Sequence, residues 1–258
     1  MSAVREARFP SEALGGPIDC LASVPEGPGP FPVVYLLHGR GDSSGSWRPV
    51  LDELAQRRQR ILIAPDAPWS ERAGYYVDSA YTTGRSVESA MLDLVAAVDA
   101  DLPTIARRES RTVAGYSMGG AGAVRLGLAH PDLFGAVIAL SPAVYVPGPP
   151  AGSSAREFGA FGIGDALFDP GRYAELAYPA ALAQYPAGLP LRLLVAAGDA
   201  EPSHEGAVPE LRMAEQAERL TREAARVPGI DASFTLYPGG HDFGVWRPAL
   251  LDALERAT

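Results

Sequence analysis

Continuous apolar runs alternate with amphipathic segments along most of this chain of 258 residues. Short apolar runs bounded by turn residues predict buried strands, and apolar residues at helical spacing predict helices that cover a sheet. The first two runs flank a turn-rich stretch and predict an opening antiparallel hairpin. The alternation predicts one α/β domain over residues 1–258, with a mostly parallel sheet and helices on both faces. The predicted strands are 3–9, 18–24, 33–37, 61–64, a short one leading into Gly115, 136–140, 191–197 and 233–237, and the predicted helices are 47–58, 87–102, 121–129, 211–225 and 246–256.

Residues 147–187 interrupt this alternation. The segment is dense in Pro, Gly, Ala and Tyr and offers only short helical possibilities. Long connections of this kind are often functional, because they leave the regular elements and run over the surface of a rigid scaffold. We therefore expect an insertion over the carboxyl edge of the sheet, well placed for substrate contacts and for a lid-like role.

A G-x-S-x-G motif, Gly115-Tyr-Ser117-Met-Gly119, lies between the short strand and the helix 121–129. In a strand–turn–helix of this kind, a strained turn exposes the serine hydroxyl at the carboxyl end of the sheet. The two glycines leave room for the strand and the helix to meet closely. A chance turn in a glycine-rich chain is the alternative, but the flanking strand and helix favour Ser117 as a nucleophile. The amide of Met118, at a helix N-terminus, is then placed to stabilise an oxyanion.

A serine nucleophile needs a base within hydrogen-bond reach, and the chain has four histidines. His38 belongs to a tight loop after a strand, His130 lies at a helix end where capping is its expected role, and His204 lies in a polar loop. His241 follows the last predicted strand in a glycine-rich loop that can bring an imidazole over the sheet edge. The sequence therefore predicts His241 as the general base.

The acid of a triad with this elbow falls between the serine and the histidine in the chain. The stretch after strand 191–197 offers two carboxylates there, Asp199 and Glu201. Either of them can orient the imidazole and stabilise its charged form. Glu201 is favoured because the acid commonly lies three residues beyond the glycine that ends this strand. Asp199, directly after a glycine, is suited to capping the loop.

The oxyanion hole needs a second amide, normally from the loop after the early strand, and Arg40 is the candidate. Its side chain is placed either to reach an anionic substrate or to remain a solvated surface group. A loop further along carries Trp69, Tyr75 and Tyr76. These rings are candidates for binding an aryl or sugar group, with covering of the core as the equal alternative.

Composition limits which kinds of partner and cofactor the protein is expected to bind. A net charge of −9 argues against a nucleic-acid-binding protein. No cluster of ligands with metal spacing appears, so neither a metal nor an organic cofactor is expected. The N-terminus lacks the apolar stretch of a signal peptide and no segment is long enough to span a membrane, which predicts a cytoplasmic protein. The oligomeric state is left open.

Several motifs match one known family, and they run from about residue 30 onward. They are Tyr35-Leu-Leu-His-Gly39 with Trp47, Tyr75 to Asp78, Gly115 to Gly120, His130-Pro-Asp-Leu-Phe-Gly135 leading to Ser141-Pro142, and His241 with Trp246. The chain resembles the esterase D-like family, which includes feruloyl esterase modules, enterochelin esterases, S-formylglutathione hydrolases and mycolyltransferases. The resemblance implies an α/β-hydrolase fold and a Ser-His-acid esterase.

The predicted function is therefore a serine carboxylesterase that cleaves a small carboxylic ester through an acyl-enzyme. An acyltransferase with the same triad is the nearest alternative, because an alcohol then replaces water when the acyl group leaves the serine. A non-catalytic binding protein that kept the fold is a further alternative, since fold does not imply function.

Overall fold

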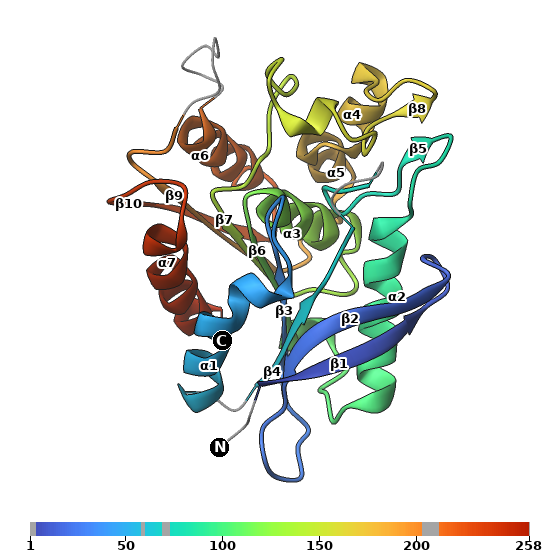
Figure 1. Ribbon diagram of the computed structural model, residues 1–258. Coiled ribbons are helices and arrows are strands. Elements are labelled where there is room, and N and C mark those ends of the chain that lie inside the picture. The colour runs from blue at the N-terminus through green and yellow to red at the C-terminus, as the bar shows by residue number, and fades with distance from the viewer. Residues whose placement is uncertain (1–3, 58–59, 69–72, 203–211, 258) are drawn as a thin grey trace.

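The computed structural model describes residues 4–57, 60–68, 73–202 and 212–257. Among them, eight strands form one sheet in the order β1-β2-β4-β3-β6-β7-β9-β10 (Figure 1). The opening hairpin β1–β2 and its pairing with β4 are antiparallel, and all other pairings in this sheet are parallel. The predicted mostly parallel α/β sheet is thus confirmed. The strands are β1 Val4–Ser11, β2 Gly16–Ser23, β3 Val33–Leu37, β4 Ile61–Pro65, β6 Arg111–Tyr116, β7 Ala136–Leu140, β9 Leu191–Gly198 and β10 Ile230–Tyr237.

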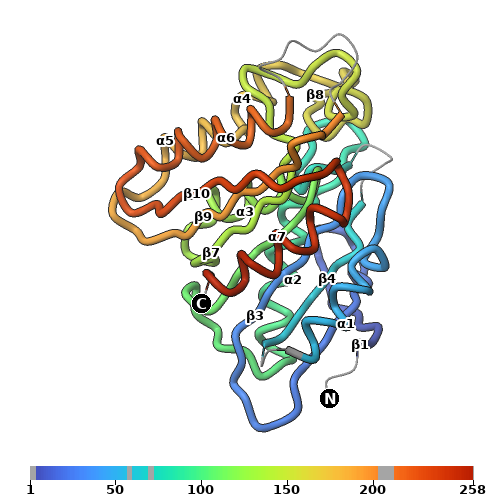
Figure 2. The backbone as a smooth tube through the Cα atoms, turned by 90° about the vertical axis from the view of Figure 1, so that its left-hand side faces the viewer, coloured from blue at the N-terminus to red at the C-terminus, as the bar shows by residue number. Residues whose placement is uncertain are grey.

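Helices cover both faces of this sheet (Figure 2). Each face buries its own apolar core: α1 and α7 pack over one face, and α2, α3 and α6 over the other. The central strands β3, β4 and β7 are buried along their whole length, as expected for parallel strands covered on both sides. In the described part of the chain, no helix is long and apolar enough to cross a membrane. The helices are α1 Arg48–Arg57, α2 Val87–Asp101, α3 Met118–Ala129, α6 Met213–Ala224 and α7 Phe243–Arg256.

Three predicted boundaries were wrong by three residues. Helix α3 begins at Met118, before the predicted 121, because the glycines of its first turn weaken the helical pattern there. Strand β10 begins at Ile230, before the predicted 233. The prediction missed this start because β10 lies at the sheet edge and its exposed Asp231 interrupts the apolar pattern. Helix α7 begins at Phe243, before the predicted 246, because the Asp242 side chain accepts a hydrogen bond from the Gly244 amide and caps the helix.

The segment 147–187 lies at the carboxyl end of the central strands, above the sheet in Figure 1. Its short strand β8 pairs in parallel with β5, which lies within the predicted loop between β4 and α2. The two segments therefore hold each other over the same edge of the sheet. The additional elements are β5 Ala80–Tyr81, η3 Ser154–Arg156, β8 Ile163–Gly164, α4 Pro170–Leu176 and α5 Tyr178–Gln184.

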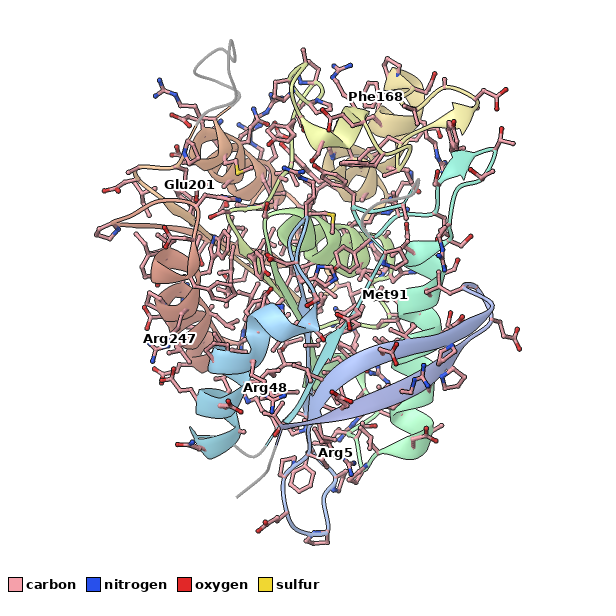
Figure 3. All side chains as sticks on the ribbon, viewed as in Figure 1. Arg5, Arg48, Met91, Phe168, Glu201 and Arg247 are labelled. Atoms are coloured by element: carbon pink, nitrogen blue, oxygen red, sulfur yellow. The ribbon has the colours of Figure 1, made fainter. Side chains whose placement is uncertain are left out.

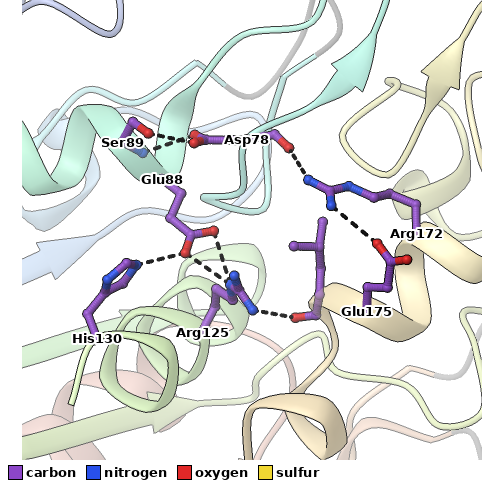
Figure 4. A network of polar contacts seen from close by, with 8 residues as sticks. Asp78, Glu88, Ser89, Arg125, His130, Arg172 and Glu175 are labelled. Carbon is purple, nitrogen blue, oxygen red and sulfur yellow. Dashed lines mark hydrogen bonds and ion pairs between the residues drawn. The ribbon is translucent and has the colours of Figure 1, made fainter. Parts of the chain in front are cut away.

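An ion cluster around the buried Glu88, with half-buried Arg125 and His130, ties α2, α3 and the end of α4 together (Figure 4). The Glu88 carboxylate on α2 accepts hydrogen bonds from Arg125 Nε at 3.0 Å and contacts His130 Nε2 at 2.8 Å. Arg125 also donates to the backbone carbonyl of Leu176, at the end of α4. The position of His130 at a helix end predicted a capping role, and His130 does end α3, but its side chain contacts Glu88 in this cluster.

We expect Glu88→Gln to lower the free energy of unfolding at pH 7 by about 3 kcal/mol, because it leaves the Arg125 charge inside without its partner. Burial by itself raises the pKa of the Glu88 carboxyl, but hydrogen bonds from His130 and Arg125 outweigh burial and hold it below its ordinary value. Such a group stabilises the fold above its unfolded pKa and stops doing so as the pH falls through its folded pKa. The difference from wild type should therefore shrink below about pH 4.5, the ordinary pKa of this carboxyl, in denaturant titrations.

Glu175→Gln is the matched control, because Glu175 belongs to the same region but is exposed, with a 3.3 Å contact to Arg172 (Figure 4). An exposed pair of this kind contributes at most about 1 kcal/mol. Equal losses for the two variants, or a loss in Glu88→Gln that does not depend on pH, would contradict a stabilising role for the buried charge pair.

Candidate active site

Ser117 lies at the turn between β6 and α3 with φ +54° and ψ −118°, the strained conformation that the motif predicts. The two motif glycines are required by contact. A Cβ on Gly115 would lie 2.2 Å from the Gly119 carbonyl oxygen, and one on Gly119 would lie 2.2 Å from the Leu37 oxygen. The Ser117 amide donates to the Leu140 carbonyl at 2.9 Å, which fixes the turn against β7. The sequence thus folds here into a tight elbow that leaves Ser117 partly exposed.

The loop after β3 passes directly over this elbow. A Cβ on Gly39 would lie 2.6 Å from the Tyr116 ring and 3.5 Å from the Ser117 Cβ, so glycine permits the close approach. The loop is held by a 2.7 Å hydrogen bond from the Tyr116 hydroxyl to Asp42. Arg40, next to Gly39, has an exposed side chain. The loop after β3 and the N-terminus of α3 thus both lie next to Ser117.

Glu201 and His241 meet at the carboxyl edge of the sheet. His241 Nδ1 lies 3.0 Å from Glu201 Oε2, and the Gly198 amide donates to Glu201 Oε1 at 2.7 Å. The loops after β9 and β10 touch, since a Cβ on Gly198 would lie 2.4 Å from the Gly239 carbonyl oxygen. Figure 3 shows Glu201 at this end of the molecule, far from Arg5. The Glu201 side chain is only 3% exposed, so its carboxylate contacts the His241 imidazole away from water.

Asp199, the other candidate acid, is used differently. Its carboxylate accepts a hydrogen bond from the Gly239 amide at 2.9 Å, and the residue is exposed. Its own amide donates to the Tyr237 carbonyl. Asp199 therefore pins the loop after β10 to the loop after β9, which is the capping role that sequence analysis gave as its alternative.

His38 is engaged on both ring nitrogens. Its Nδ1 contacts the Gly39 carbonyl at 2.8 Å, and its Nε2 accepts from the Ala67 amide at 3.1 Å. Burial lowers the pKa of His38, which favours the neutral ring that these contacts need. His38 thus holds the loop after β3 in place. His204 lies outside the described residues.

The predicted aromatic contacts divide into three cases. Trp69 lies outside the described residues. Tyr76 has no exposed surface, and its hydroxyl donates to the His38 carbonyl at 3.1 Å, so it covers the core and supports the loop after β3. This is the alternative role that the sequence left open for the rings. Tyr75 is buried too, but it lines a cavity and bonds Ser154 of the segment 147–187.

An apolar cavity of about 30 Å³ lies beside the elbow. Ala121 and Ala143, which line it, both donate their amides to the Ser117 carbonyl at 3.0 Å. Phe161 and Tyr173 from the segment 147–187 close its other side, with ring centres 4.8 Å apart. A cavity of this size holds little more than one or two small groups.

Sequence reasoning assigned no role to Ser141 or Trp246, which it quoted only within the family motifs. Ser141 follows β7 with φ +43° and is fully buried. Its hydroxyl forms a short hydrogen bond with Glu201 Oε1 and accepts one from Trp246 Nε1 at 2.9 Å. The only available signal was the position of Ser141 at the end of a predicted strand, where parallel sheets gather functional residues.

The fold defines an α/β-hydrolase, and the comparison with known families agrees with it. Residues 11–257 match the family described as "Putative esterase". The chain belongs to this family, which makes it a serine hydrolase. The resemblance stated from the sequence motifs is thereby confirmed, as is the predicted class of enzyme.

Individual relatives are distant. The substrate-bound serine hydrolase FphF of Staphylococcus aureus has a TM-score of 0.75 at 19% identity, over 99% of this chain and 98% of that one. A ferulic acid esterase has a TM-score of 0.75 at 24% identity, over 100% and 98%. An uncharacterized protein of Mycobacterium tuberculosis is 34% identical over 118 residues, covering 44% of this chain. The match spans 30% of that relative's length. These likenesses support the fold and leave the substrate to the site itself.

Proposed function

We propose that the protein is a serine carboxylesterase with Ser117 as nucleophile, His241 as general base and Glu201 as the acid of the triad. Ser117 Oγ attacks the ester carbonyl while His241 takes its proton, and His241 then protonates the leaving alkoxide. Water activated by the same imidazole releases the acid from the acyl-enzyme. The amides of Met118 and Arg40 stabilise the oxyanion of both tetrahedral intermediates.

The observation that carries this proposal is the hydrogen-bonded pair of Glu201 and His241 on the edge where the Ser117 elbow opens. The carboxylate is bound on Oε1 by the Gly198 amide, so Oε2 remains for His241 Nδ1. A carboxylate placed there favours the tautomer with its proton on Nδ1 and leaves Nε2 free to act as the base.

The cavity beside Ser117 supports a short acyl group as substrate. For p-nitrophenyl esters from acetate to decanoate, we expect kcat/KM to fall by about tenfold or more beyond the shortest chains, because each excess methylene must displace packed rings. Phe161→Ala opens the cavity and should move the preference to longer chains. In this proposal the segment 147–187 supplies the far wall of the acyl pocket.

Phe168→Ala is the matched control for that variant. Phe168 lies in the same segment and packs on Tyr173 with ring centres 5.9 Å apart, but it does not line the cavity. Its chain-length profile should equal that of wild type. A wild-type preference for decanoate, or equal profiles for the two phenylalanine variants, would place the acyl group elsewhere.

The same assay separates hydrolysis from acyl transfer. With an added alcohol, a carboxylesterase releases mainly the free acid, whereas an acyltransferase passes the acyl group to the alcohol and forms a new ester. Product analysis at increasing alcohol concentration measures this partition. A dominant new ester at millimolar alcohol would replace the esterase proposal with the acyltransferase.

A further inference from the structure

The Ser141 hydroxyl has two hydrogen-bond partners, Trp246 and Glu201, and it can donate its proton to only one of them. A hydroxyl carries a single hydrogen and accepts on its lone pairs. Trp246 Nε1 is a donor only, so its 2.9 Å contact with Ser141 Oγ uses a lone pair of that oxygen. The short contact between Ser141 Oγ and Glu201 Oε1 therefore uses the hydroxyl hydrogen, donated to the carboxylate. The indole N–H thus sets the direction in which Ser141 donates.

This donation completes the hydrogen bonding of a buried carboxylate. Glu201 Oε1 accepts from Ser141 and from the Gly198 amide, while Oε2 faces His241. Two donors on one oxygen fix the plane of the carboxylate, which in turn fixes the imidazole. The effect depends on Ser141 lying at φ +43° with no exposed surface, so that water does not compete for its hydroxyl.

Trp246 also touches the site with its ring. Its indole packs edge-on against His241, with centres 4.9 Å apart and planes at 88°, and stacks on Tyr116 at 4.3 Å and 16°. Tyr116 precedes Ser117 and holds the loop after β3 through Asp42. One buried side chain therefore contacts the base, the strand that carries the nucleophile and, through Ser141, the acid.

We propose that Trp246 and Ser141 are positioning residues for this esterase: the indole N–H orients the Ser141 hydroxyl, and the hydroxyl holds Glu201 in the geometry that aligns His241. The inference rests on the proposed Ser117–His241–Glu201 triad. Neither residue takes part in a chemical step or touches the substrate. They affect the alignment of His241 for the chemical step and do not affect substrate binding. Their substitution should therefore lower kcat and leave KM unchanged.

The test compares Trp246→Phe with Trp47→Phe. Trp47 is fully buried and packs on the same Tyr116 ring at 5.0 Å, but among the described residues its indole N–H has no hydrogen-bond partner. Both variants lose an indole N–H and part of a ring from one aromatic cluster, yet only one loses a hydrogen bond to Ser141. We expect Trp246→Phe to lower kcat on p-nitrophenyl acetate by about tenfold with KM unchanged, and Trp47→Phe to change kcat by less than about twofold.

Ser141→Ala completes a double-mutant cycle and keeps the same Cβ at the positive φ. If Trp246 acts through Ser141, the two substitutions are not additive, and Trp246→Phe should lower kcat little further in the Ser141→Ala background. Additive effects, equal kcat losses in the two tryptophan variants, or a loss confined to KM would overturn the inference. Wild type and Ser117→Ala are run beside them: a wild type without Ser117-dependent turnover refutes the proposed function itself, whereas an active wild type with an unaffected Trp246→Phe refutes only the positioning roles.

Discussion

Ser117→Ala is expected to lower kcat for p-nitrophenyl acetate by about 10⁴-fold or more, while the protein remains folded. Ser117 is the proposed nucleophile, so the loss of its hydroxyl removes the acyl-enzyme route. Residual turnover then comes from the oxyanion donors and from substrate binding alone. Steady-state hydrolysis at high enzyme concentration measures the difference, and circular dichroism verifies the fold.

Ser110→Ala provides the matched control, because Ser110 lies just before the opposite end of strand β6. It should keep wild-type turnover. A fluorophosphonate probe, which reacts with activated serines, should label wild type and Ser110→Ala but leave Ser117→Ala unlabelled. Labelling of Ser117→Ala, or turnover within about tenfold of wild type, would show that another residue is the nucleophile.

The fold and the elbow were predictable because their signals are local. Strands β3, β4 and β7 are short apolar runs that need cover on both faces, and their bounds were predicted to within one residue. The elbow is encoded just as locally. Gly115 meets the carbonyl of Gly119 within the motif itself, so sequence spacing carries that contact, whereas Gly119 meets Leu37 of the adjacent strand β3.

The contacts around Glu201 could not be predicted from the sequence, because they join segments that are far apart in the chain. Ser141 and Trp246 are 105 positions apart, and their hydrogen bond depends on the way the loops after β7 and β10 close over Glu201. The cavity beside the elbow is assembled from the loop before α2, from α3, from the residues after β7 and from the segment 147–187. No hydrophobic periodicity or motif within one segment predicts contacts between segments that are distant in the sequence. Spacing favoured Glu201 over Asp199, but the contacts that distinguish them exist only in the folded protein.

Those contacts make the exchange of Glu201 for glutamine the sharpest test of the acid. Ser141 and the Gly198 amide both donate to Oε1, so the amide oxygen of a glutamine takes that place and its NH₂ group faces His241 Nδ1. His241 must then accept on Nδ1 and carry its proton on Nε2, where it no longer serves as a base. We expect Glu201→Gln to lower kcat by about 10³- to 10⁴-fold, because an amide in place of the triad carboxylate selects the wrong tautomer.

Asp199→Asn is the paired variant. It separates the effect of losing the proposed acid, Glu201, from any effect of changing the loop after β9 that carries both residues. An asparagine oxygen accepts from the Gly239 amide as the Asp199 carboxylate does, so the loop keeps its hydrogen bond. Its kcat should stay within about threefold of wild type, since the change removes no partner of His241. The ratio of the two losses decides the assignment. If Asp199→Asn lost more turnover than Glu201→Gln, Asp199 would act as the acid in solution and the His241–Glu201 contact would be structural.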